Sequence, residues 1–562
     1  MFLRESSQRR KTGETVTYLQ FAESLWDPKT KRAQTRIVYN FGRADDPAVI
    51  ERLRRLARSI LRREHPEELA PASTSIRVVD CWPYGDLYVL NALWDRLGIR
   101  AIVENTAAEG RQRFPVERAL FALVANRATA PCSKLYCYEQ WLREDVRLVG
   151  TADLGLHHLY RAMDFLEAHK DAIEQSVYFQ VSNLLNLEVD ILFYDTTSLH
   201  FEVDEEDQGD AKGQVRGSAP SGGKRYPAPR KRGYSKNGRS DAPQVVIGLA
   251  VSRDGIPVRH WVFPGNTVDV TTVAQVKKDL RGWRLGRCLF VGDAGMVSAD
   301  NLHTLSRGGE KYLVGMPLRR GDEVTKEVLA RPGRYRTVAD NLKVKEVLVG
   351  DGERRRRYVV CFNPQEAERQ RKHREQVLAE LRAELDTVAA GPTAALSKRV
   401  SALRTSGRYG AYLTLTRDHT LQIDPAKVAR AARFDGKFVV HSNDDTLSPE
   451  DMALGYKQQL RVEQAWRTLK SGLSLRPVFH WAPHRIHAHI ALTVLSLLLE
   501  RVIERECQDT WRNIRDDLRH VKLVQLAGSD GELWQVTDPM PAAARRLQQL
   551  RLPPPPPLLA VR

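Results

Sequence analysis

Two short apolar runs, each ending in an aspartate, constrain the fold of this chain more than any other feature. They are Val189–Asp195 and Cys288–Asp293. A run of about four to eight residues that is apolar on both faces is typical of a strand buried inside a sheet. Each run is therefore predicted to be a buried strand that closes at its carboxylate, within a domain that combines helices and strands.

The segments around these runs give the order of the elements. Residues 244–263 contain two strand patterns joined by the turn Arg-Asp-Gly-Ile-Pro, which predicts an antiparallel hairpin. Helical patterns over residues 270–283 and 298–306 flank the second run, and another strand is predicted at 311–316. The order strand, strand, strand, helix, strand, helix, strand is that of the ribonuclease-H-like α/β fold. In that fold the two aspartate-bearing strands are neighbours, so both carboxylates are expected at one edge.

The rest of the chain divides by pattern into further regions, which makes this a multidomain α/β protein. A helical domain is expected to precede the ribonuclease-H-like mixed sheet, and a β-rich insertion is expected to interrupt it. The predicted regions are a small basic module of strands and an Arg-rich helix at 1–70, a helical DNA-binding or orienting domain at 71–187, the catalytic domain at 188–317 and 444–500, a β-rich insertion with a long charged helix at 318–443, and a helical C-terminal region with a Pro-rich tail at 501–562.

The charge balance indicates a polyanionic partner. The 562 residues include 87 Lys and Arg against 70 Asp and Glu, so the formal net charge is +17 and the pI is about 9.6. Nucleic acid is the partner that such a surface favours. The segment 201–243 is polar and rich in Gly and Pro, acidic at first and then basic. Its composition predicts a mobile loop, and the alternative is a segment that becomes ordered on a DNA backbone.

Several other classes of protein are not supported. Six scattered cysteines without a CxxC pair argue against a disulfide framework and a zinc finger. The longest apolar run, 490–499, falls short of the ~20 residues that cross a bilayer, and the first residues lack the apolar core of a signal peptide. There is no GxxxxGK[ST] phosphate loop, so an NTP-driven reaction has no support. We therefore expect a cytoplasmic, nucleoid-associated protein without a membrane partner.

A third carboxylate lies on a helix that is predicted to begin after the N-cap residue Ser448. Glu463 stands seven residues from both Tyr456 and Lys470. Seven residues of an α-helix leave a rotation of only about −20°, so these side chains are predicted to form one stripe. The residues that join or flank this stripe are Gln459, Trp466 and Arg467.

Two aspartates and a glutamate without histidine or cysteine make a hard oxygen site, suited to Mg²⁺ or Mn²⁺. Two such ions about 3.5–4 Å apart activate water or a 3′-hydroxyl and stabilise the leaving oxygen when a phosphodiester is cleaved. Lys470 and Arg467 offer positive charge to a DNA strand, while Tyr456 and Trp466 offer hydrogen bonding or stacking.

The three acidic motifs also resemble those of a known family. Phe193–Ser198, Val291–Met296 and Tyr456–Lys470 resemble the DDE transposases of bacterial insertion sequences, in the subgroup with a β-strand insertion before the glutamate. The resemblance extends from about Tyr194 to Leu499. Three further segments are similar to that subgroup: Pro264–Thr267, Gly315–Pro317 and Leu475–His480.

The resemblance implies that Asp195, Asp293 and Glu463 are the catalytic acids that bind two Mg²⁺ or Mn²⁺ ions. It implies that Tyr456 and Lys470 contact DNA near the cut. Gln459 stands where the family usually has an arginine, which puts one phosphate contact in doubt. Nearby Arg461 lies about 200° away around the helix and does not replace that arginine. The implied activity is cleavage at the inverted ends of a mobile element and joining of the 3′-hydroxyls to target DNA, by a homodimer assembled on DNA.

Two other functions remain open from the sequence. One is a metal-dependent nuclease of the same fold that cleaves without joining. The other is a catalytically inactive, transposase-derived DNA-binding protein. His484, His487 and His489 form an HxxHxH pattern that we expect on the surface or facing DNA rather than at a metal. Glu202, at the mouth of the 201–243 segment, is not expected to be an active-site acid.

Overall fold

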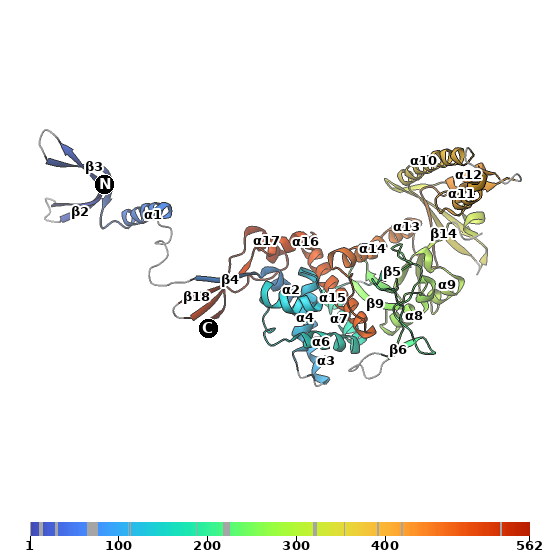
Figure 1. Cartoon of the computed structure of the whole chain (residues 1–562), viewed down its shortest axis with the longest axis horizontal. Coiled ribbons are helices and arrows are strands. Elements are labelled where there is room, and N and C mark those ends of the chain that lie inside the picture. The colour runs from blue at the N-terminus through green and yellow to red at the C-terminus, as the bar shows by residue number, and fades with distance from the viewer. Residues whose placement is uncertain are drawn as a thin grey trace. The chain divides into compact units, whose positions relative to one another are not determined.

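The structure is a computed structural model in which the chain forms two compact units (Figure 1). The first comprises Met1–Cys81, Leu523–Thr537 and Pro556–Arg562, and the second comprises Trp82–Lys522 and Asp538–Pro555. The structure describes residues 2–9, 15–27, 32–64, 77–110, 112, 114–187, 189–216, 225–318, 323–352, 355–389, 393–416, 420–528 and 531–561.

The first unit begins with an antiparallel sheet of three strands followed by a helix. These elements are β1 (Phe2–Arg9), β2 (Thr15–Asp27), β3 (Arg32–Arg43) and α1 (Pro47–Glu64). Leu19, Phe41 and Val49 form a small core between the sheet and the helix. The strands and the Arg-rich helix that the sequence predicts here are confirmed.

The C-terminal region is not wholly helical, which corrects the prediction for 501–562. Two helices are present, α16 (Trp511–Leu518) and α17 (Pro541–Gln549). Three strands also occur and join an earlier one in the order β20-β19-β18-β4. β18 pairs with β19 over six residue pairs. The strands are β4 (Arg77–Pro83), β18 (Lys522–Gly528), β19 (Gly531–Val536) and β20 (Leu558–Val561).

The second unit starts with the helical region that the sequence predicts. Its helices are α2 (Gly85–Arg96), α3 (Ile99–Glu109), α4 (Val116–Thr129), the short α5 (Lys134–Tyr136) with a π-helical turn (Cys137–Asp145), α6 (Leu156–Ala168) and α7 (Lys170–Leu184). Figure 1 shows them gathered beside α15 (Pro483–Cys507), which contacts α4 and α6. Among the described residues α15 alone is long and apolar enough to cross a membrane, but 83% of its most apolar stretch is buried. It is the central helix of a protein core.

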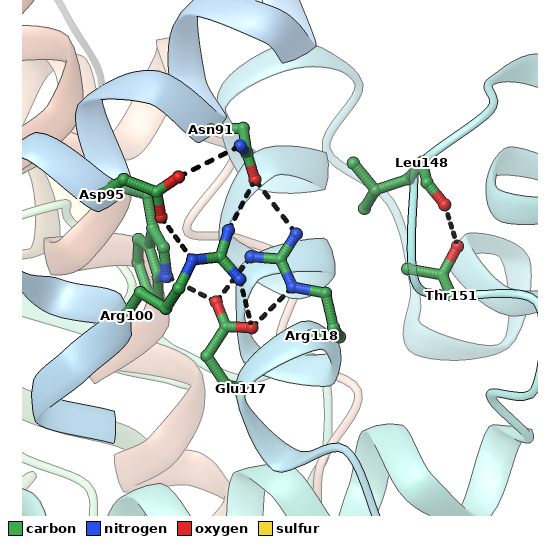
Figure 2. A network of polar contacts seen from close by, with 8 residues as sticks. Asn91, Asp95, Arg100, Glu117, Arg118, Leu148 and Thr151 are labelled. Atoms are coloured by element: carbon green, nitrogen blue, oxygen red, sulfur yellow. Dashed lines mark hydrogen bonds and ion pairs between the residues drawn. The ribbon is translucent and has the colours of Figure 1, made fainter. Parts of the chain in front are cut away.

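A buried polar network holds three of these helices together (Figure 2). The Glu117 carboxylate, on α4, accepts hydrogen bonds from the indole of Trp94 (2.8 Å) and from the guanidiniums of Arg100 (3.0 Å) and Arg118 (2.5 and 2.6 Å). Asn91 accepts from the same two arginines at 3.1 and 3.0 Å. Each buried charge in this network therefore has its partners within the chain, as burial requires.

The centre of the second unit is a nine-stranded sheet of order β12-β13-β14-β17-β11-β10-β5-β8-β9. β8 is antiparallel to both of its neighbours, β5 and β9, whereas β10 is parallel to β5 and β11 is parallel to β10. This arrangement confirms the ribonuclease-H-like order. The strands of this part are β5 (Ile191–His200), β8 (Gln244–Ser252), β9 (Pro257–Pro264), β10 (Leu289–Gly292) and β11 (Tyr312–Met316).

The side chains of β5 alternate between two hydrophobic cores, one on each face of the sheet. Helices cover both faces. Leu192 and Tyr194 pack with α8 (Asp269–Gly282) and α9 (Ala299–Ser306) on one face. Ile191 and Phe193 pack on the other face with α15 and with two helices described below. Burial on both faces explains why the four residues of β5 before Asp195 are Ile, Leu, Phe and Tyr.

The insertion extends the central sheet instead of forming a sheet of its own. Its strands are β12 (Arg336–Ala339), β13 (Leu342–Val349), β14 (Arg356–Phe362) and β17 (Lys437–Ser442), and β17 pairs with both β14 and β11. A separate pair, β15 (Leu413–Leu415) with β16 (Leu421–Ile423), stands apart from it. The insertion also contains a π-helical turn (Glu323–Val328), the predicted long charged helix α10 (Pro364–Ala389), α11 (Thr393–Thr405) and α12 (Pro425–Ala432).

Candidate active site

Asp195 does not end its strand, which corrects the prediction. β5 continues to His200, because Asp195 and the residues after it remain paired with β8. The parallel neighbour β10 does end here: Gly292, its last residue, pairs with Tyr194, and Asp293 follows it. The two aspartates therefore stand side by side at the edge where β10 stops. This is the juxtaposition that the strand order predicts.

The electrostatics of Asp195 confirm that other carboxylates are near. Burial raises the pKa of the Asp195 carboxyl above its ordinary value. The negative charges of Asp293 and Asp269 act in the same direction, and the ammonium of Lys236 opposes them. Asp269 is the first residue of α8 and was not among the predicted site residues. No local sequence signal indicates it, because only the tertiary structure brings the start of α8 next to Thr196 on β5.

The helix that carries the third acid begins as predicted but is interrupted. Ser448 caps α13 (Pro449–Lys457), and its hydroxyl accepts a hydrogen bond from the Asp451 amide at 3.0 Å. A second helix, α14 (Leu460–Arg467), follows after a break, and a π-helical turn (Thr468–Gly472) continues it. The prediction of one straight α-helix is therefore wrong, although the residues at the break keep right-handed helical backbone angles.

Tyr456 lies among the three predicted acids. Its hydroxyl donates to Oδ1 of Asp293 at 3.3 Å. Burial raises the pKa of this phenol well above its ordinary value, and the charges of Asp293, Glu463 and Asp195 raise it further. Gly315 on β11 makes the approach possible, since a Cβ there would lie 2.2 Å from the tyrosine hydroxyl. Tyr456 is therefore a neutral hydrogen-bond donor at a cluster of carboxylates.

The carboxylate oxygens at this edge of the sheet are ligands that suit a hard cation. The described residues contain no group of three His, Cys, Asp or Glu side chains placed to hold a metal ion. A cationic group does lie at the carboxylates. The Lys236 ammonium is 3.5 Å from Oδ1 of Asp195 and 3.0 Å from Oδ2 of Asp269. Burial alone would lower the pKa of Lys236, but Asp195 and Asp269 raise it overall. Oxygen atoms at this edge therefore bind a cationic group of the chain itself.

The predicted DNA contacts differ in how accessible they are. Arg467 is exposed, and Lys470 is half-buried with its ammonium donating to Oδ1 of Asn237 at 3.1 Å. Gln459 is buried at the helix break. Trp466 is only 6% exposed and packs in the core beneath the sheet, so the prediction that it stacks on DNA is wrong. The apolar face of α14 must cover the sheet, and Trp466 lies on that face.

The 201–243 segment is more ordered than its composition predicts. Its described parts, 201–216 and 225–243, include a short hairpin of β6 (Gln214–Arg216) and β7 (Arg225–Pro227). Arg230 is buried and donates to the Asp207 carboxylate at 2.9 Å. The acidic first half and the basic second half thus pair with each other, which is why the segment holds a structure with little apolar surface.

A cavity of about 550 Å³ opens beside Lys470. The indole of Trp481 is 66% exposed at this cavity, and the Arg230 guanidinium lies 4.6 Å from its ring centroid. Positive groups and aromatic rings therefore line the same opening. The lining residues are His200, Phe201, Glu202, Val203, Arg230, Lys470, Arg476, Pro477, Val478, Phe479, His480 and Trp481.

The three histidines of the HxxHxH pattern are not on the surface, contrary to expectation. His484 is fully buried with its Nε2 3.1 Å from Asp164, and His487 is half-buried with Nδ1 3.4 Å from Glu167. Nε2 of the buried His489 is 3.1 Å from the Leu475 carbonyl. They join α15 to α6 and to the loop after α14, because the first turns of α15 lie inside the core. Their role is structural.

Comparison with known proteins supplies two family matches. A family model described as the N-terminal domain of IS1634 family transposases matches residues 3–72. A model described as the transposase DDE domain matches residues 210–499, a range that includes Asp293 and Glu463 and begins after Asp195. No curated protein matches the sequence significantly. Among solved structures, a piggyBac transposase synaptic complex with hairpin DNA is similar at 10% identity and a TM-score of 0.33, over 78% of this chain and 79% of that one.

Proposed function

The chain belongs to the DDE transposase family and is a DDE-type DNA transposase, and we propose that it binds the inverted ends of a mobile element, cleaves them and joins the 3′-hydroxyl ends to target DNA. One observation supports the catalytic assignment above all others. Asp195 lies on β5, Asp293 directly follows the parallel neighbour β10, and the Tyr456 hydroxyl donates to Asp293 at 3.3 Å.

Asp195, Asp293 and Glu463 would hold the divalent metal, two Mg²⁺ or Mn²⁺ ions, through carboxylate oxygens. When bound, such ions supply an activated water or 3′-hydroxyl and stabilise the leaving oxygen. The chain's own contribution is to fix the carboxylates. β5 and β10 set the spacing of the aspartates, and the Tyr456 hydroxyl restrains the Asp293 carboxylate through its hydrogen bond.

DNA would approach over the basic side chains that border this edge. Lys470 and Arg476 face the 550 Å³ cavity, and exposed Arg467 lies on the same helical segment as Glu463. Tyr456 would contact the strand near the cut. Trp481 offers the aromatic surface that buried Trp466 does not.

The partners follow from the reaction. Two element ends and a target require double-stranded DNA and, we propose, a homodimer assembled on it. The basic module at 1–70 and the helical region at 71–187 would recognise and orient the ends. The protein would act at the nucleoid in the cytoplasm, without NTP.

Cleavage and joining are tested together with a labelled oligonucleotide that carries an element end, a supercoiled plasmid and Mg²⁺ or Mn²⁺. Asp195→Asn, Asp293→Asn and Glu463→Gln are each expected to reduce both steps by about 10³-fold or more, because each removes a metal ligand worth several kcal/mol in the transition state. Asp300→Asn, an exposed aspartate on α9, is the matched control.

The outcomes separate this function from its alternatives. Labelled plasmid is the expected product. Cleavage without joined product would indicate a nuclease, and metal-dependent DNA binding without cleavage would indicate an inactive DNA-binding protein. Full activity in Asp195→Asn or Glu463→Gln would show that the catalytic residues are assigned wrongly.

A further inference from the structure

The Lys236 ammonium has more oxygen partners than a surface ion pair requires. It donates to the backbone carbonyl and to the hydroxyl of Thr196, both at 2.8 Å. It also lies 3.0 Å from Oδ2 of Asp269 and 3.5 Å from Oδ1 of Asp195. The contact with Asp195 is the longest of the four. The ammonium is therefore held by Thr196 and Asp269 and placed beside the catalytic carboxylate.

The turn that carries Lys236 is fixed to β5 beyond Asp195. The Lys236 amide donates to the Ser198 hydroxyl at 3.0 Å, and the Asn237 side chain donates to the Ser198 carbonyl at 2.8 Å. Asn237 in turn accepts from Lys470 at 3.1 Å. The extension of β5 past Asp195 is thus the platform for this turn.

Thr196 and Asp269 complete the arrangement. The Thr196 hydroxyl accepts from Lys236 and donates to Oδ1 of Asp269 at 2.5 Å, so all three groups have consistent hydrogen-bond roles. A lysine bound in this way keeps its position when Asp195 turns to another cation, because only the weakest of its contacts is lost.

We propose that Lys236 is a fixed positive charge that balances Asp195 in the metal-free protein and opposes metal binding there until the DNA phosphate is present. The inference rests on the proposed role of Asp195 as a metal ligand. An ammonium beside a divalent ion repels it, and an anionic phosphate bound to both relieves that repulsion. Lys236 thereby couples loading of the metal to arrival of the substrate.

This role predicts two effects of opposite direction in Lys236→Met, which keeps the side-chain length and removes the charge. Mn²⁺ should bind the DNA-free protein about tenfold more tightly, because the repulsion is gone. Cleavage at saturating Mn²⁺ should be about tenfold slower, because the phosphate loses a cation. A purely structural role would weaken metal binding and cleavage together.

The test is an Mn²⁺ titration of the full chain followed by electron paramagnetic resonance, with and without DNA ends. Lys236→Arg, which keeps the charge, should retain wild-type affinity. Lys231→Met is the matched control, because Lys231 lies in the same segment and pairs with Glu206 at 3.5 Å, away from Asp195. Circular dichroism checks that each variant is folded, and Lys236→Gln is the second neutral variant.

Unchanged or weaker Mn²⁺ affinity in folded Lys236→Met and Lys236→Gln would overturn the proposal. So would an equal gain of affinity in Lys231→Met. Asp195→Asn separates this failure from that of the proposed function. If Asp195→Asn leaves Mn²⁺ binding unchanged, the metal assignment is wrong and the role of Lys236 fails with it. If binding is lost in Asp195→Asn but Lys236 has no effect, only the present inference fails.

Discussion

The Glu117 network and the sheet edge that carries Asp195 and Asp293 differ in how far the chain neutralises their carboxylates. Glu117 is paired with two arginines and a tryptophan, all from the same helical region (Figure 2). At the sheet edge, the Lys236 ammonium lies at ion-pair distance from Asp195 and Asp269, and the described residues show no ion pair for Asp293 or Glu463. A charge that the chain itself neutralises supports the fold, whereas an excess of one sign attracts a ligand of the other sign.

The largest expected effect is in the neutralised network. Glu117→Ala should lower the free energy of unfolding by about 3–5 kcal/mol, because the buried Trp94 indole and two half-buried arginines lose their shared carboxylate. Urea unfolding measures this loss, and Glu109→Ala, at the exposed end of α3, is the control. A loss as small as the control's would break the comparison, since Glu117 would then be no more important than a surface charge.

A second neutralised carboxylate joins the helical region to the catalytic sheet and gives a pH test. Glu174 on α7 lies 3.0 Å from Lys170 and 2.6 Å from Nδ1 of His260 on β9. Burial would raise its pKa, but Lys170 and His260 lower it to about 2. Because the folded pKa lies below the unfolded one, the carboxylate stabilises the protein above about pH 4.5 and loses this effect as the pH falls towards 2.

Glu174→Gln should therefore lower the free energy of unfolding by about 2–3 kcal/mol at pH 7. The difference from wild type should shrink steadily below about pH 4.5, as followed by denaturant titration at several pH values. A difference that stays constant with pH would mean that packing, and not charge, accounts for the effect.

At the cavity beside Lys470, Trp481→Ala should weaken DNA-end binding by about 1–3 kcal/mol. The exposed ring of Trp481 beside Arg230 offers a surface on which a base can stack. Fluorescence anisotropy with a labelled element end measures the affinity. Phe179→Ala, an exposed aromatic on α7, should leave the affinity unchanged. Equal losses in both variants would show that the cavity is not a preferred DNA contact.

The smallest effect is expected from Arg476→Gln. Removing one phosphate contact should reduce the slope of log affinity against log salt by about one unit. The same titration with Arg382→Gln, on the exposed face of α10, should keep the wild-type slope. An unchanged slope in Arg476→Gln would place the DNA path elsewhere on the surface.

The sequence predicted the fold where the pattern was local. Buried runs ending in aspartate, a glycine turn between strands and a capping serine each specify an element through nearby residues alone. The prediction was wrong for the single straight helix, for the wholly helical C-terminal region and for the mobile 201–243 segment. In the last two cases contacts between distant residues decided: β18 lies beside β4 in the C-terminal sheet, and in the described part of the 201–243 segment Arg230 pairs with Asp207.

The residues of the candidate site also fall into two groups, those that the sequence indicates and those that only the tertiary structure reveals. Asp195, Asp293, Glu463, Tyr456 and Lys470 were predicted from spacing and resemblance. The structure brings Asp195, Asp293 and Tyr456 to one edge of the sheet. Lys236 and Asp269 carry no local pattern that separates them from other charged residues. They matter only because the turn after Tyr234 is bound to β5 and because α8 begins at the same edge.

The sequence by itself determined which strands are buried and which acids follow them, because periodicity and chain order act over a few residues. Only the tertiary structure decided which charges are neutralised. A carboxylate becomes a structural group or a candidate ligand according to the cations that folding brings within a few ångströms, and those cations come from segments far along the chain.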